Sequence, residues 1–126
     1  MEKILIVDDS ADIRELVKVT LGDDQYQVFE ADSGSVAIEM ARLKNPDVII
    51  MDIIMPGSCD GIAAAKVIKK DPALKTCHII FLSGSRIDPN RLKSIKQNSY
   101  EYIIKPFSPL HLLERIEQCL ARKTFA

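Results

Sequence analysis

The stretch KILIVDDS, residues 3–10, decides how this chain folds. It begins with an unbroken apolar run from Ile4 to Val7, changes to two neighbouring acids at Asp8 and Asp9, and then reaches Ser10. Short continuous runs of β-branched and leucine side chains are typical of strands buried on both faces, which occur mainly in parallel sheets covered by helices. Serine is a common helix cap, and apolar residues at helical spacing follow it. The stretch therefore predicts a buried parallel strand that leads directly into a helix, with two carboxylates at the junction.

The same pattern recurs along the rest of the chain. Four more apolar runs are YQVFEA (26–31), DVIIMD (47–52), HIIFLS (78–83) and YIIK (102–105), and each precedes a helical pattern. YQVFEA alternates more than the others, which suits an edge strand. The helices are expected to start at Ser10, Ser33, Asp60, Asp88-Pro89 and Ser108-Pro109, and to end at Gly22, Asn45-Pro46, Asp71-Pro72 and, for the last, near Lys123. Five strand–helix units predict a single domain over residues 1–126, a doubly wound α/β fold with a five-stranded parallel sheet between two helix layers.

The composition excludes several classes of protein. The chain has 126 residues, of which 47% are hydrophobic and 28% charged, and its net charge of -1 provides no field that would attract nucleic acid or an anionic membrane. Three cysteines without CxxC spacing argue against a disulfide framework or a zinc site. The sequence shows no secretion signal and no apolar run long enough to span a membrane. We therefore expect a cytoplasmic protein with reduced thiols.

Polar residues stand where the predicted strands end. Asp8 and Asp9 follow the first strand, Asp52 ends the third, Ser83 ends the fourth and Lys105 ends the fifth. In doubly wound sheets, ligands bind outside the carboxyl ends of the strands. Carboxylate oxygens suit a hard cation such as Mg²⁺, which would also relieve repulsion between the acids. A cation, a lysine and a hydroxyl together would bind a phosphoryl group.

The motifs VDDS (7–10), DVIIMDIIMP (47–56) followed by DG (60–61), FLSG (81–84) and YIIKPF (102–107) together resemble the receiver domain of two-component response regulators, the CheY-like family. They occur in the family's order and spacing over nearly the whole chain, and five separated motifs are far more specific than any one of them. The resemblance implies a flavodoxin-like fold with strand order 2-1-3-4-5.

The resemblance also implies a phosphoacceptor and a metal site. Asp52 would accept the phosphoryl group. Asp9, Asp52 and the backbone carbonyl of Ile54 would ligate Mg²⁺, or Mn²⁺ in its place, and Asp8 would act mostly through a bound water.

Further roles are implied on the fourth and fifth strands. Ser83 and Lys105 would each bind a phosphoryl oxygen, Ser83 and Tyr102 would act as switch residues, and the Lys105–Pro106 peptide bond would be cis. The expected function is a phosphorelay switch. A histidine kinase or a histidine phosphotransfer protein donates the group, and the surface over the fourth helix, fifth strand and fifth helix then changes. An effector protein or output domain would respond to it, without direct contact to nucleic acid or membrane, and a homodimer on phosphorylation is a further expectation.

The chain departs from the family pattern at several positions. The loop at Gly57–Cys59 is one residue longer than usual, Ser83 replaces the commoner threonine, and Asn98–Ser99 replaces a Gly-Ala pair before the fifth strand. Ile54 and Ser85 stand at the positions that flank the path of the water that removes the phosphoryl group in the family.

Other functions remain as rivals. A Mg²⁺-dependent phosphatase with an aspartyl nucleophile commonly carries an acid two residues after that nucleophile, where this chain has Ile54, so a signalling switch is favoured over an enzyme. A P-loop nucleotide switch is disfavoured because no GxxxxGK follows the first strand. A receiver excised from a larger regulator or hybrid kinase stays open beside a stand-alone one.

Overall fold

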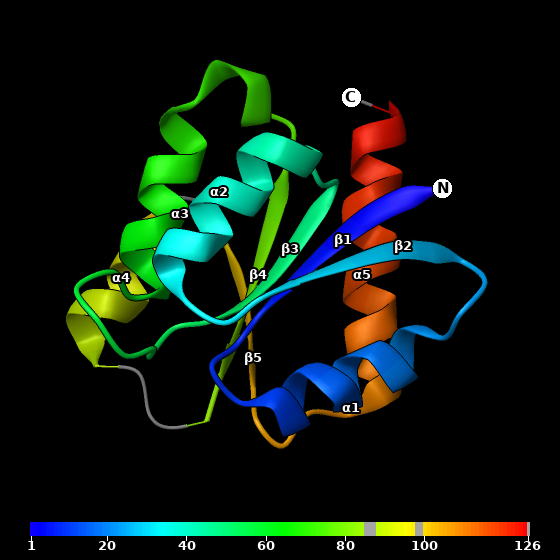
Figure 1. Cartoon of the computed structure of the whole chain (residues 1–126), viewed down its shortest axis with the longest axis horizontal. Helices are drawn as coiled ribbons and strands as arrows, with labels where there is room; N and C mark the ends of the chain where they lie inside the picture. Colours follow the sequence, from blue (N-terminus) through cyan, green and yellow to red (C-terminus); the bar gives the residue numbers. More distant parts are fainter. Residues whose placement is uncertain (85–87, 98–99, 126) are drawn as a thin grey trace.

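A computed structural model of the chain describes residues 1–84, 88–97 and 100–125, which form alternating strands and helices (Figure 1). Ser85 and Asn98–Ser99, to which the sequence assigns roles, lie outside these residues. The strands are β1 (Glu2–Val7), β2 (Tyr26–Ala31), β3 (Val48–Asp52), β4 (His78–Ser83) and β5 (Glu101–Ile104). The helices are α1 (Ala11–Leu21), α2 (Gly34–Lys44), α3 (Gly61–Lys70), α4 (Pro89–Gln97) and α5 (Pro109–Phe125), with a 3-10 turn, η1, at Pro72–Leu74.

The strands form one sheet in the order β2-β1-β3-β4-β5, and every neighbouring pair is parallel. This confirms the doubly wound fold and its strand order. β1 and β3 pair at the centre of the sheet, with Val7 opposite Met51. The strand order reverses between these two strands, so their carboxyl ends meet where ligands bind in such folds.

Helices cover both faces of the sheet (Figure 1). Alternate strand residues point to opposite faces. Leu5, Val7 and Met51 pack in a core cluster with buried residues of α2, α3 and α4, whereas Ile4 and Ile6 pack in a second cluster with α1 and α5. Burial on both faces explains why the strands are apolar along their whole length.

Side-chain caps set where the helices begin. The Ser10, Ser33 and Asp60 side chains accept hydrogen bonds from backbone N–H groups in the first turns of α1, α2 and α3. The last helix extends to Phe125, two residues beyond the expected end, because neither glycine nor proline follows Lys123. No helix among the described residues is long and apolar enough to cross a membrane.

Candidate functional site

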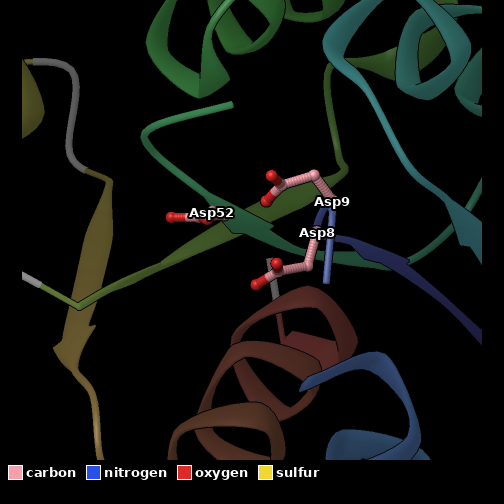
Figure 2. A group of neighbouring side chains, drawn as sticks. All are labelled: Asp8, Asp9 and Asp52. Carbon is pink, nitrogen blue, oxygen red and sulfur yellow. The ribbon is translucent and has the colours of Figure 1, made fainter. Parts of the chain in front are cut away.

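Three acids meet at the carboxyl edge of the sheet. Asp8 and Asp9 follow the last residue of β1, and Asp52 is the last residue of β3. Figure 2 shows their side chains extending to the same side of the two strands, and one carboxylate oxygen of each lies within 4.8 Å of the others. Asp8 and Asp52 are buried, whereas Asp9 is exposed. The sequence placed these three residues together because the ends of parallel strands share one edge.

Lys105 provides the positive charge opposite these acids. It follows β5, and its Nζ lies 3.0 Å from Asp8 Oδ2 and 3.5 Å from Asp52 Oδ2. The Lys105 backbone N–H donates to the carbonyl of Ser83, the last residue of β4, over 2.6 Å. The ends of β4 and β5 are thereby joined, which places Ser83 at the same edge as the acids. The Lys105–Pro106 peptide bond is cis.

The Asp52 carboxylate makes longer polar contacts than the carboxylate of Asp8. Its Oδ1 accepts from the backbone N–H of Ile54 over 3.3 Å, and its Oδ2 contacts Lys105 at 3.5 Å. Asp8 Oδ1 accepts from the Ser10 N–H at 2.9 Å, and Oδ2 accepts from Lys105 at 3.0 Å. Burial raises the pKa of Asp52, as does the nearby charge of Asp8, while Lys105 acts in the opposite direction. A carboxylate with a raised pKa and long contacts is a better nucleophile than one that is fully engaged.

The loop after Asp52 requires a glycine at the start of α3. A Cβ on Gly61 would lie 2.1 Å from the Asp52 carbonyl oxygen, and the Gly61 N–H donates to the Ile53 carbonyl at 2.8 Å. Any other residue would push the helix away from the end of β3. The Asp60-Gly61 pair of the sequence motif therefore both caps α3 and allows it to begin against the strand that carries Asp52.

The chain matches the response regulator receiver domain family over residues 4–117. It is 37% identical over 120 residues to the transcriptional regulatory protein ResD of Bacillus subtilis, a match that covers 95% of this chain and 48% of ResD. The corresponding match to the phosphate regulon transcriptional regulatory protein PhoB of Pseudomonas aeruginosa is 35% over 119 residues, which covers 94% and 52%. Among solved structures, the chemotaxis protein CheY4 of Vibrio cholerae superposes with a TM-score of 0.83 at 32% identity, covering 94% of this chain and 98% of that one. The chain belongs to the response regulator receiver domain family.

This receiver domain spans about half the length of the curated relatives that it matches. Receiver domains are signalling switches of two-component systems, and they typically bind Mg²⁺ through an acidic pocket. The donor set here fits that ion, because three carboxylates at one edge supply the hard oxygen ligands that Mg²⁺ prefers. The alternative function, a phosphatase with an aspartyl nucleophile, is not favoured. Such an enzyme commonly carries an acid two residues after the nucleophile, where this chain has Ile54, an exposed apolar residue.

Two expected switch residues lie at different distances from the acids. Ser83 is buried at the end of β4, next to Lys105 along the sheet edge. Tyr102 lies earlier in β5, opposite Phe81 in the strand register, and its half-buried side chain packs against the cluster that includes α4. Ser83 thus lies at the same sheet edge as the acids, whereas Tyr102 lies two residues before the end of β5.

The sequence reasoning missed Arg14. Its side chain extends from α1 to the β1 end, where Nη1 donates to the Asp8 backbone carbonyl over 2.7 Å. One signal was available: Arg14 precedes the buried Val17 and Leu21 by three and seven residues, so a charged residue occupies the apolar stripe of the helix.

Proposed function

We propose that this receiver domain accepts a phosphoryl group on Asp52 from a phosphohistidine of a histidine kinase or a histidine phosphotransfer protein. The observation that carries the proposal is the convergence of Asp8, Asp9, Asp52 and Lys105 at the point where the strand order reverses. Each charged group alone has a structural explanation, but the gathering of three acids and Lys105 at a ligand-binding edge does not.

In the transfer, an oxygen of the Asp52 carboxylate attacks phosphorus in line with the leaving nitrogen. The new O–P bond forms as the P–N bond breaks, and its electron pair returns to the partner's imidazole. Asp52 is chosen over Asp8 because both Asp8 oxygens already accept short hydrogen bonds. Lys105 would move from the acids to an oxygen of the transferred group, and Ser83 would donate its hydroxyl to another.

The acidic cluster would hold Mg²⁺, or Mn²⁺ in its place. Asp9, Asp52 and the Ile54 backbone carbonyl would be ligands, and Asp8 would act mainly through a water. When bound, the ion would offset the negative charge that meets at Asp52 during transfer.

We further propose that residues 1–126 form one receiver domain that acts in the cytoplasm on an output domain or effector protein. Phosphorylation would change the surface over α4, β5 and α5, with Ser83 and Tyr102 as switch residues. A hollow over β5 and the start of α5, lined by Tyr102, Ile104, Phe107 and His111 among others, supports partner binding there. Dimerisation on phosphorylation is part of the same proposal, whereas direct contact with nucleic acid or membrane is not.

The proposal is tested by incubating the protein with Mg²⁺ and phosphoramidate, a small donor with a P–N bond, followed by intact mass measurement. The wild type should gain one phosphoryl group. Asp52→Asn should gain none, because the amide is a poor nucleophile, while Asp24→Asn, which changes an exposed acid before β2, should be labelled as the wild type is. Undiminished labelling of Asp52→Asn would show that another residue is the acceptor.

A further inference from the structure

The peptide group between Asp8 and Asp9 accepts a hydrogen bond from a side chain of α1. Arg14 Nη1 donates to the Asp8 carbonyl oxygen over 2.7 Å, and the Asp8 N–H donates to the Ala31 carbonyl of β2 at 3.1 Å. The peptide unit is planar, so fixing the Asp8 carbonyl oxygen also fixes the plane that leads to the Asp9 Cα. The direction in which the exposed Asp9 side chain leaves the chain therefore depends on Arg14.

A residue of the edge strand β2, Glu30, holds the Arg14 side chain in place. Its Nε donates to Glu30 Oε1 over 3.0 Å, and Lys18, one turn further along α1, reaches Glu30 Oε2 at 3.2 Å. Burial alone would raise the pKa of Glu30, but the hydrogen bonds from Lys18 and Arg14 outweigh it and lower the pKa. Glu30 is thus a carboxylate at neutral pH, and the Arg14 side chain, only 19% exposed, spans from it to the Asp8 carbonyl.

We propose that Arg14, anchored by Glu30, is a positioning residue that orients the Asp8–Asp9 peptide so that the Asp9 carboxylate faces Asp52 for metal binding. Figure 2 shows the Asp9 and Asp52 carboxylates on the same side of the two strand ends. Through this link β2, whose own carboxyl end supplies no side chain to the acidic cluster, contributes to the site. The inference rests on the proposed function for the role of the metal.

A positioning role and a purely electrostatic role make opposite predictions for Mg²⁺ affinity. Removing a positive charge near three carboxylates makes the cluster more negative, which alone would strengthen binding of a cation. Losing a residue that orients a ligand instead weakens binding, by about 10-fold to 100-fold where such supporting groups have been removed from metal sites. The sign of the change therefore separates the two roles.

The test measures Mg²⁺ affinity by following backbone amide shifts during titration of the full chain. Arg14→Met should bind Mg²⁺ about tenfold more weakly than the wild type. Lys18→Met is the matched control, because it removes the same charge from the same helix and the same Glu30 partner without touching the Asp8 carbonyl. It should bind Mg²⁺ as tightly as the wild type or slightly more tightly. Equal or tighter binding by Arg14→Met would overturn the proposal.

A second variant and a metal-free measurement keep the test decisive. Arg14→Lys keeps the positive charge but lacks the guanidinium that bonds to Glu30 and to the Asp8 carbonyl at once, so this variant should lose part of its affinity for Mg²⁺. If Arg14→Met does not fold, an Arg14→Lys variant that binds Mg²⁺ as tightly as the wild type overturns the proposal. Without metal, the Asp9 amide nitrogen shift should change in Arg14→Met and not in Lys18→Met, because a hydrogen bond to the Asp8 carbonyl polarises that peptide group. If the wild type binds no Mg²⁺ or is not labelled at Asp52, the proposed function fails, and the Asp9 shift still decides the role of Arg14.

Discussion

Ile54 is the residue with the clearest expected effect on how long the phosphoryl group stays on Asp52. It lies two residues after Asp52, the residue is 55% exposed, and its side chain offers no group that can hydrogen-bond to a water. We predict that Ile54→Asn speeds loss of the phosphoryl group about tenfold, equivalent to about 1.4 kcal/mol on the barrier, because an amide can orient the attacking water.

The measurement is the decay of purified phosphoprotein in Mg²⁺ without a donor. Leu43→Asn serves as control, since it makes the same kind of change at an exposed apolar residue on α2, away from the acidic cluster. Decay of Ile54→Asn that is no faster than the wild type would mean that other groups control access of water to the phosphorus.

The acids and the lysine of the site could be predicted residue by residue, whereas the contacts that hold them could not. Asp8, Asp52 and Lys105 were found because each stands at the end of a strand or directly after it, and parallel strands end at a common edge. The bond from Arg14 to the Asp8 carbonyl depends on how closely α1 packs against the end of β1, a distance that no local pattern encodes. The same holds for the fact that Lys105 lies closer to the Asp8 carboxylate than to that of Asp52.

At the scale of elements, the strands and helices were predicted to within one or two residues because caps and breakers mark them. Ser10 and Ser33 cap the helices that they were expected to cap, and the left-handed backbone at Asn45 ends α2. The turn η1 was missed because Asp71-Pro72 was interpreted only as a stop, although Asp71 also caps this short turn. The strand order was predicted from the family resemblance, because the sequence of a strand does not specify which other strand pairs with it.

The ends of β4 and β5 should carry the signal from Asp52 to α4 and α5. Ser83 and Lys105 are joined through the backbone at this edge, and each would bond to an oxygen that exists only after phosphorylation. A group that contacts only one state stabilises that state selectively. We predict that Lys105→Ala and Ser83→Ala still accept some label but show smaller amide shift changes over α4 and β5. Shift changes as large as in the wild type, in both variants, would contradict this.

For the molecule as a whole, Mg²⁺ should be a stabilising ligand. Among the residues that the structure describes, the carboxylates of Asp8, Asp9 and Asp52 lie together and Lys105 forms ion pairs with two of them, so repulsion among the three acids remains in the metal-free protein. An ion that binds only the folded state at a hundredfold excess over its Kd adds about 2.7 kcal/mol to the free energy of unfolding, or about 10 °C in Tm for a chain of this size.

Asp9→Asn tests the origin of that gain in stability. Removing one of three neighbouring charges should raise the metal-free Tm slightly, because less repulsion remains in the folded state, and should abolish most of the increase caused by Mg²⁺, because a ligand is lost. Asp12→Asn removes the same charge from the first turn of α1, outside the cluster, where an acid favours the helix. Its metal-free Tm should therefore be unchanged or lower, with the response to Mg²⁺ intact. Thermal unfolding of both variants, with and without Mg²⁺, gives the comparison, and a metal-free Asp9→Asn that melts below the wild type would show that repulsion among the acids does not limit the stability of the fold.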